Sequence, residues 1–339
     1  MIQSLRRLSS ASIIPALNRA TSRVLISKKR GDTRARDAQL SLMRWLEKRS
    51  ISFDLDADDN DNVDLIRSSS SSKCSLKRAS DEDPPDLIVT LGGDGTVLRA
   101  VDSFVGANDD SCESSGSSSA PPVVAFAVGS LGFLTPHAFG DFESVLNRVF
   151  DSESFLAVTR RSRLYCEVFE ENSRCVSAHR VLNECLVARG SRSSFHRLDV
   201  SVDGQFVAQF QADGLILATP SGSSAYSLAV GGSLVAPTVP AILLTPVAPH
   251  SLSTRPLILP ESAVVEISVA NGNRSPPVVS FDGKHEKELI EGMGVRIQGA
   301  GGSVPFIRNA GSPAELSEWF TSLRSKLHWA HELRPLIRV

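Results

Sequence analysis

Residues 86–99 read DLIVTLGGDGTVLR, and this stretch sets a buried strand directly before a helix. The apolar run 87–91 has the length and composition of a strand that is covered on both faces. Two glycines then allow a tight turn, and Val97 and Val101 begin a helical pattern beyond it. A strand that turns through glycine into a helix directs backbone N–H groups toward one point, which suits an anion such as phosphate.

Asp94 stands in this loop, where phosphate groups are expected. A carboxylate there repels phosphate unless it takes part in the chemistry, by accepting a proton from an attacking hydroxyl or by helping to hold a metal ion. The loop matches neither G-x-x-x-x-G-K-[ST] nor G-x-G-x-x-G, and no lysine follows it. A tight turn with a capping aspartate stays an alternative interpretation of the loop taken alone.

Strand-like and helix-like segments alternate on both sides of this loop through the first half of the chain. Residues 23–27 and 122–128 are apolar runs, and residues 33–49 carry apolar side chains at helical spacing. This alternation predicts a parallel sheet with helices on both faces. The second half is rich in strand-like runs, and Asp203-Gly204 between two of them is typical of a type I′ hairpin.

The change of pattern predicts an N-terminal α/β domain over residues 22–150 and a β-rich domain over residues 151–310. Residues 311–339 are expected to form a helix and a tail, with the helix packing back on the first domain, because a capping box at 312–315 precedes an apolar stripe. Polar composition without a hydrophobic period predicts disordered insertions in the first domain at 56–62, 67–73 and 107–122.

The first thirty residues are rich in arginine and serine, and no acidic residue occurs before Asp32. This composition favours an organellar transit peptide over residues 1–21 and a mitochondrial protein, with a basic tail on a cytoplasmic protein as the alternative. The net charge of −2 argues against a nucleic-acid binder. No apolar run reaches transmembrane length, so no membrane segment is expected.

Three later segments carry further polar groups. Asn183-Glu184 interrupts an apolar, strand-like run, where an amide and a carboxylate can clamp two ribose hydroxyls; a polar pair on an exposed strand face is the alternative. Residues 212–237 are dense in glycine and in hydroxyl side chains that can cap a short helix or bind a sugar. Residues 280–284, SFDGK, are also compatible with a simple hairpin turn.

These four segments, in this order, resemble the NAD kinase family. Its glycine-aspartate loop is similar to residues 92–96, and its Asn-Glu pair to Asn183-Glu184. Its Thr-Pro-Thr-Gly-Ser-Thr-Ala-Tyr segment is similar to residues 219–226, with Ser221 and Ser224 in place of threonine. The late Asp-Gly resembles Asp282-Gly283, and residues 129–136 and 255–260 also look like family segments. Within the family, the sequence looks most like the eukaryotic mitochondrial NADH kinases, because of its transit-like start and residues 239–252, VPAILLTPVAPHSL.

The resemblance implies a Rossmann-like N-terminal α/β domain and a β-sandwich-like C-terminal domain, with the site between them. It also implies transfer of a phosphoryl group from ATP, with Mg²⁺, to the 2′-hydroxyl of the adenosine ribose of NAD⁺ or NADH. Asp94 would be the base or the group that orients the hydroxyl, Asn183 and Glu184 would hold ribose hydroxyls, and Phe133 would line the pocket. Without a P-loop lysine, metal and backbone N–H groups would carry most of the phosphate charge. The protein is expected to be a homo-oligomer, a dimer or a tetramer.

The substrate-binding set carried over from the resemblance surrounds the two substrates, and no residue is assigned as a metal ligand. Ser224, Ala225 and Tyr226, together with Asp213, would lie around an adenosine or nicotinamide group. The full set is Gly92, Gly93, Gly95, Thr96, Phe133, Asn183, Glu184, Asp213, Ser221, Ser224, Ala225, Tyr226 and Asp282. Two other functions stay open from the sequence: a diacylglycerol or sphingoid-base kinase, which shares the Gly-Gly-Asp-Gly loop, and a dinucleotide-binding regulator without turnover.

Overall fold

The computed structural model describes eight stretches of the chain. They are residues 13–56, 74–77, 84–102, 120–151, 154–170, 173–190, 196–309 and 316–329. The first twelve residues of the expected transit peptide, almost all of the three expected insertions and the capping box at 312–315 lie outside the described residues.

The N-terminal domain is built on five parallel strands in the spatial order β4-β3-β2-β5-β6. Their bounds are Arg23–Lys28 for β2, Ser52–Asp56 for β3, Cys74–Lys77 for β4, Leu87–Gly92 for β5 and Val123–Ala127 for β6. From β2 the chain adds β3 and then β4 on one side, and it then returns to add β5 and β6 on the other side of β2. In such sheets, ligands bind beyond the carboxyl ends of the two central strands. That point is where the glycine-rich loop leaves β5.

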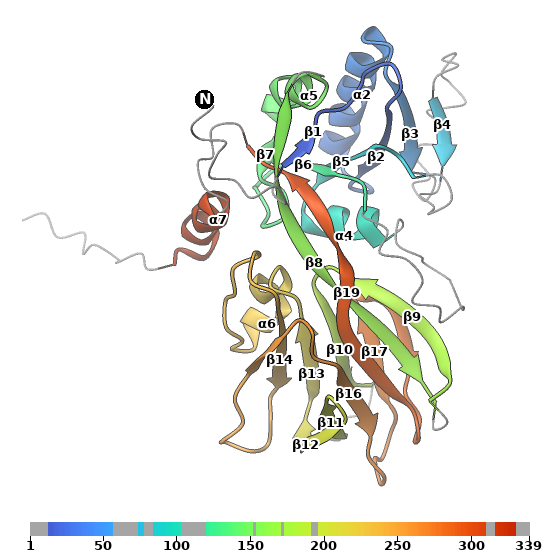
Figure 1. The fold of residues 1–339 in the computed structure, drawn as a ribbon, viewed down its shortest axis with the longest axis vertical. Helices are drawn as coiled ribbons and strands as arrows, with labels where there is room; N and C mark the ends of the chain where they lie inside the picture. The colour runs from blue at the N-terminus through green and yellow to red at the C-terminus, as the bar shows by residue number, and fades with distance from the viewer. Residues whose placement is uncertain are drawn as a thin grey trace, which may run out of the picture.

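Helices cover both faces of this sheet. Alternate strand residues point to opposite faces, so Val24 packs in one core with α2 (Thr33–Lys48) and α5 (Phe142–Val149). Leu25 packs on the other face with α4 (Asp94–Asp102). This arrangement, drawn in Figure 1, confirms the predicted parallel sheet with helices on both sides.

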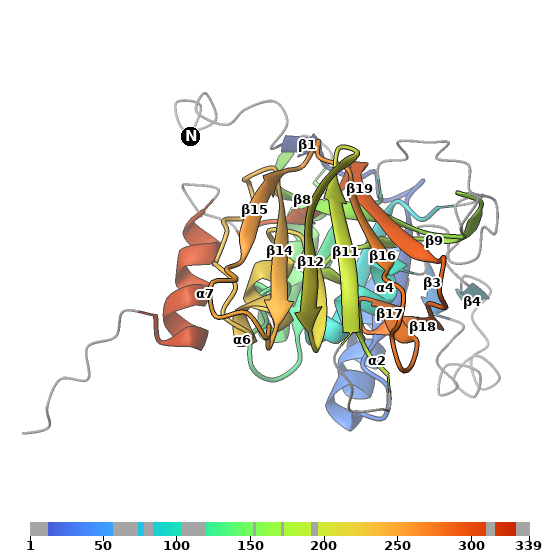
Figure 2. The same cartoon turned by 90° about the horizontal axis from the view of Figure 1, so that it is seen from below.

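The C-terminal domain is an antiparallel β-sandwich, as expected. One layer holds β8 (Phe155–Phe169), β9 (Cys175–Val181), β11 (His196–Val202), β12 (Gln205–Ala212), β16 (Val265–Val269) and β19 (Gly294–Ile307). The other runs β15-β14-β13-β10-β17-β18, with bounds Leu257–Pro260, Ala241–Val247, Gly214–Ala218, Glu184–Arg189, Pro277–Phe281 and Lys284–Glu288. Figure 2 shows these strands from below. Asp203 (φ 50°) and Gly204 (φ 76°) join β11 to β12, as the hairpin signal predicts.

Two long strands, β8 and β19, run through both domains (Figure 1). Near its end, β19 pairs in parallel with β6, through Phe306 opposite Val123. The start of β8 pairs with β1 (Ile13–Pro15), which lies within the segment expected to be a transit peptide. Residues 13–15 are therefore part of the folded sheet. The two domains are joined by continuous strands, which fix the position of one set of site residues relative to the other.

The C-terminal helix α7 (Ser317–Leu327) stands at one side of the molecule in both views (Figures 1 and 2). Of its predicted apolar stripe, Leu323 is buried and Phe320 is exposed. The side chain of Lys326 lies over the Phe133 ring, so the helix packs back on the first domain as expected. No described helix is long and apolar enough to cross a membrane.

Candidate active site

The glycine-rich loop joins β5 to α4 at the centre of the parallel sheet. A Cβ on Gly92 would lie 2.3 Å from Thr96 Oγ1, so glycine is required there for Thr96 to pack in its buried position. Gly93 and Gly95 differ from Gly92, because a Cβ on either would meet nothing within 4 Å and neither has a positive φ. Neither packing nor backbone geometry explains these two glycines. Their missing side chains leave room for a molecule to approach the backbone.

The Asp94 carboxylate holds a second loop of the first domain. Its Oδ2 accepts a hydrogen bond from the Phe133 N–H (2.9 Å), and its Oδ1 accepts one from the Leu134 N–H (3.0 Å). A Cβ on Gly132 would lie 1.7 Å from Asp94 Oδ1, so only glycine permits this approach. Each carboxylate oxygen can accept more than one hydrogen bond. Asp94 therefore organises the segment around Phe133 and still has capacity to accept a hydroxyl proton.

Arg161, on β8, connects this segment to the C-terminal domain. Its NH2 donates to the Phe133 carbonyl oxygen (3.1 Å) and its NH1 donates to Ser221 Oγ (3.0 Å). Desolvation lowers the pKa of Arg161 to about 10, and the negative charge of Asp94 opposes that shift. Sequence reasoning missed this residue, because an arginine in the basic run RRSR on a strand belongs to no motif.

Residues 219–224 are locked onto the Asn-Glu pair. The Thr219 N–H donates to the Asn183 carbonyl oxygen (2.8 Å), and Thr219 Oγ1 donates to the Leu182 carbonyl oxygen (2.6 Å). A Cβ on Gly222 would lie 2.2 Å from the Asn183 carbonyl oxygen, so glycine allows the close approach. Ser221 and Ser224 belong to the same turn, in which Ser224 Oγ donates to the Ser221 carbonyl oxygen (3.1 Å). The structure thus brings the two motifs together.

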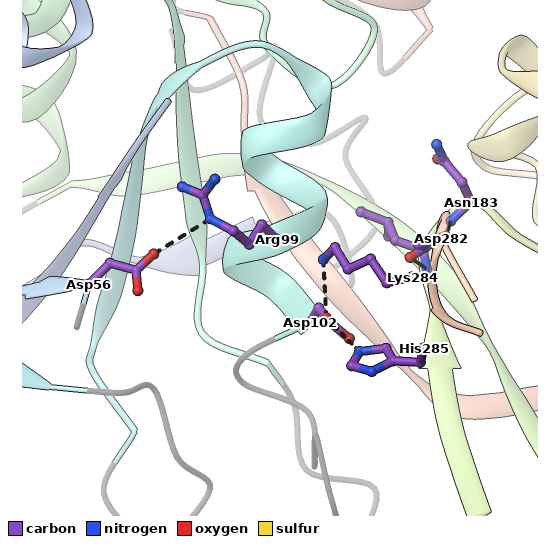
Figure 3. Close-up of polar contacts among 8 residues, drawn as sticks. Asp56, Arg99, Asp102, Asn183, Asp282, Lys284 and His285 are labelled. Atoms are coloured by element: carbon purple, nitrogen blue, oxygen red, sulfur yellow. Dashed lines mark hydrogen bonds and ion pairs between the residues drawn. The ribbon is translucent and has the colours of Figure 1, made fainter. Parts of the chain in front are cut away.

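Asp282 supports the same pair from the other side. Its Oδ1 accepts hydrogen bonds from the N–H groups of Asn183 (2.8 Å) and Glu184 (3.0 Å), and its Oδ2 accepts one from Leu182 N–H (2.8 Å). The turn that presents it has positive φ at Asp282 and Gly283. Because three of its acceptor positions are taken by backbone N–H groups, the Asp282 carboxylate supports the backbone of the Asn-Glu pair. Figure 3 shows it next to Asn183.

The side chain of Glu184 is poised for a ligand. Burial and the nearby charge of Asp282 raise its pKa to about 7. Its Oε2 is buried without a hydrogen-bond partner among the described residues. A buried carboxylate oxygen that lacks a partner is costly, and a hydroxyl donor would remove that cost.

Two of the predicted site residues, Asp213 and Tyr226, lie apart from the bonded contacts described above. Asp213 precedes β13, whereas residues 219–226 follow it, and a five-residue strand spans roughly 16 Å. Asp213 instead pairs with Arg189 (3.2 Å between Oδ1 and NH1). The structure therefore does not bring Asp213 to the other predicted residues within one chain. Tyr226, which follows Ala225 and opens the short helix α6 (Tyr226–Ala229), is 41% exposed.

A separate polar cluster ties the two domains together beside the site (Figure 3). Asp102, the last residue of α4, accepts hydrogen bonds from Lys284 Nζ (3.0 Å) and His285 Nε2 (3.1 Å). Lys284 follows Gly283 directly, so the helix that begins with Asp94 is bonded at its end to the turn that presents Asp282. A cavity of about 870 Å³ lies elsewhere, lined in part by Arg160, Pro240 and Glu261, and contains none of the predicted site residues.

Residues 24–154 match the N-terminal domain of ATP-NAD kinases, and residues 182–309 match their C-terminal domain. The chain belongs to the ATP-NAD kinase family. The chloroplastic NAD kinase 2 of Arabidopsis thaliana is 40% identical over 252 residues, which cover 73% of this chain and 24% of that protein. A mitochondrial NADH kinase of Saccharomyces cerevisiae is 41% identical over 212 residues, which cover 61% of this chain and 48% of that protein. The chain thus spans about half or less of the length of these relatives.

Among solved structures, a yeast NADH kinase complexed with NADH superimposes with a TM-score of 0.80 at 29% identity. The match covers 93% of this chain and 90% of that one. This agreement extends over both domains, and it confirms the α/β domain followed by a β-sandwich that the family resemblance implied. The lipid kinase alternative, which left the Asn-Glu pair unexplained, loses its basis.

Proposed function

We propose that this chain is a kinase that transfers the γ-phosphoryl group of MgATP to the 2′-hydroxyl of the adenosine ribose of NAD⁺ or NADH. The observation that carries the proposal is one connected set of contacts across the two domains. Asp94 binds the Phe133 backbone, Arg161 joins Phe133 to Ser221, and the turn of Ser221 is locked onto Asn183. The match to a structure described as complexed with NADH supports a dinucleotide as the acceptor.

In the proposed step, Asp94 accepts the proton of the 2′-hydroxyl as its oxygen bonds to the γ-phosphorus. The bond between that phosphorus and the oxygen bridging to the β-phosphate breaks, and ADP leaves with the electron pair. Asn183 and Glu184 hold the ribose hydroxyls, which orients the reacting oxygen. Asp282 acts through them, because it fixes their backbone.

The remaining predicted residues are assigned to binding. The loop of Gly92, Gly93, Gly95 and Thr96 receives phosphate groups at its backbone, and Phe133 lines the pocket. Ser224, Ala225 and Tyr226 lie around an adenosine or nicotinamide group. Mg²⁺ is proposed to enter with ATP, because Mg²⁺ is commonly held by substrate phosphates, waters and one or two carboxylates. Among the described residues, no group of three or more His, Cys, Asp or Glu could hold a metal ion.

Formation of NADP(H) from NAD⁺ or NADH and MgATP tests the function, with both acceptors compared at equal concentration. No product from either acceptor, in a protein that still binds both substrates, would leave the regulator interpretation in place. Asn183→Ala and Glu184→Ala are expected to weaken dinucleotide binding more than ATP binding, by about 1–3 kcal/mol for each lost hydrogen bond. Equal losses for both substrates would instead indicate a structural role for the pair.

For localisation, we propose the mitochondrion, on the basis of the acid-free start and a mitochondrial NADH kinase among the relatives. A reporter fused to residues 1–30 is expected to enter mitochondria, and entry into chloroplasts or a diffuse signal would contradict this. Because residues 13–15 pair with β8, the boundary at residue 21 would remove a paired strand. We expect a chain starting at residue 13 to be more stable than one starting at residue 22, measured by thermal melting.

We also propose a homo-oligomer. Two edge strands of the sandwich, one in each layer, expose large apolar side chains: Phe206 on β12 and Ile258 on β15. Exposed apolar edge strands are suited to pairing with another chain. Light scattering of the purified protein measures the mass in solution, and a mass of one chain at all concentrations would exclude the proposal.

A further inference from the structure

Lys326 lies near the end of α7, and its ammonium group lies against the segment that Asp94 organises. Its Nζ atom is 5.2 Å from the centre of the Phe133 ring. The atom is buried and has no hydrogen-bond partner in the part of the chain that the structure describes. An ammonium group has three donors and is costly to bury without acceptors. The position is therefore suited to an acceptor that none of the described residues supplies.

The contacts of α7 hold Lys326 at this position. Glu318, in the first turn, accepts a hydrogen bond from the Asn309 N–H (2.5 Å). Asn309 Nδ2 in turn donates to the carbonyl oxygen of Pro136 (3.1 Å), three residues after Phe133. Leu323, one turn before Lys326, is buried. The helix is thus attached at both ends to the region that surrounds Asp94.

Two cations, Lys326 and Arg161, lie in the electrostatic field of Asp94, and they differ in how far their donors are already used. Burial lowers the pKa of Lys326, and the negative charge of Asp94 raises it. Arg161 also lies within the field of Asp94, but its NH1 and NH2 already donate to Ser221 and to the Phe133 carbonyl. Within the described residues, Arg161 keeps only its Nε without a partner, whereas all three donors of the Lys326 ammonium group are unused.

We propose that Lys326 binds phosphate oxygens of ATP, so that α7 supplies the phosphate-binding lysine that the loop at residues 92–96 lacks. The proposal rests on the kinase function proposed above. A triphosphate next to the Asp94 carboxylate brings like charges together, and an ammonium group on the same side offsets their repulsion. We assign Lys326 to ATP and not to the dinucleotide pyrophosphate, because it contacts the Asp94 segment, whereas Glu184 belongs to the six-stranded sheet.

The test compares Lys326→Met with Arg324→Met, a matched control that removes the same charge from an exposed position on the same helix. Binding of three probes is measured by calorimetry: a non-hydrolysable ATP analogue with Mg²⁺, inorganic tripolyphosphate, and NADH. Lys326→Met is expected to raise the dissociation constants of the analogue and of tripolyphosphate by about tenfold or more, as for the loss of a charge-assisted contact. The dissociation constant of NADH should rise by less than about twofold. Arg324→Met is expected to bind all three as the wild type does. Lys326→Arg, which keeps the charge, should retain most of the affinity for the analogue.

Unchanged affinity of Lys326→Met for the analogue would overturn the proposal, as would an equal loss for NADH. Thermal melting reports whether each variant is folded. If Lys326→Met does not fold, Lys326→Gln gives the same comparison with a polar side chain of similar length. Failure of the kinase function is seen separately, as wild-type protein that binds the analogue but forms no NADP(H).

Discussion

Asp94 and Asp282 are both followed by glycine, both accept hydrogen bonds from backbone N–H groups, and both lie at the meeting of the two domains. Asp94 binds two N–H groups of a loop 39 and 40 residues away and has Arg161 and Lys326 in its electrostatic field. Asp282 binds three N–H groups of the Asn-Glu strand, and burial raises its pKa.

Asp94 and Asp282 share an Asp-Gly sequence, but their different surroundings indicate two different roles. A carboxylate among cations, beside glycines with open space above them, is suited to reacting groups. A carboxylate enclosed by three backbone donors is suited to holding a strand in place. We therefore expect substitutions at Asp94 to change the rate, and substitutions at Asp282 to change stability and binding.

The largest effect is expected for Asp94→Asn. Asparagine cannot accept the hydroxyl proton, so kcat should fall by roughly 10²–10⁴. The amide also presents only one oxygen to the Phe133 and Leu134 N–H groups, so a change in the loop itself is a second cause of lost activity. Thr135→Val separates these causes, because it removes the oxygen that accepts the Gly132 N–H (2.5 Å) and leaves the carboxylate intact.

In steady-state assays, Thr135→Val is expected to lose less than about tenfold in kcat, well short of the loss of a general base. A similar fall in both variants would assign a structural role to Asp94. An Asp94→Asn protein with more than about a third of normal kcat and an unchanged melting temperature would also end the catalytic interpretation.

The next effect is a loss of stability in Asp282→Asn. One amide oxygen can still accept two N–H groups, but the amide nitrogen then faces the third, which leaves a buried donor unpaired. We expect the free energy of unfolding to fall by about 1–3 kcal/mol. Denaturant unfolding measures this, and NADH titration should show weaker binding, because the backbone of Asn183 and Glu184 is no longer fixed. Normal stability together with a kcat loss as large as that of Asp94→Asn would reverse the comparison.

How far these roles could be predicted from the sequence depends on the distance over which each signal acts. The strand–helix alternation and the Asp203-Gly204 turn are local, and the structure confirms them. Asp213 belongs to the carried-over set, yet in this chain it pairs with Arg189 at the opposite end of β13 from residues 219–226. A motif lists neighbours in the chain and does not show which end of a strand each occupies. Arg161 and Lys326 escaped notice because their partners lie far away in the chain, as with Ser221, sixty residues from Arg161.

A smaller effect concerns pH and Glu184, whose carboxylate lies beside Asp282. Its pKa of about 7 in the folded protein means that it is largely neutral below pH 7. The ionised form is the better acceptor for ribose hydroxyls, so NADH affinity should rise with pH. For a pKa near 7, the dissociation constant should fall by about tenfold from pH 6 to pH 8. Fluorescence titration without ATP measures it, and Glu184→Gln should be flat; an equal slope in both proteins would assign the titration to another group.

The smallest effect concerns Asp102, whose hydrogen bonds join the helix that begins at Asp94 to the turn that presents Asp282. Asp102 ends the helix that Asp94 begins, and its carboxylate accepts from Lys284, two residues after Asp282. Both side chains keep part of their surface in water, 31% for Lys284 and 23% for Asp102, so solvent screens the pair. A double-mutant cycle of Asp102→Asn and Lys284→Met should therefore give a coupling energy of about 0.2–1 kcal/mol in the free energy of unfolding, smaller at high salt. Because β8 and β19 already join the domains covalently, kcat should change by less than about threefold. A coupling well above that range, or a loss of kcat that follows it, would mean that this bridge and not the paired strands sets the spacing between Asp94 and the Asn-Glu pair.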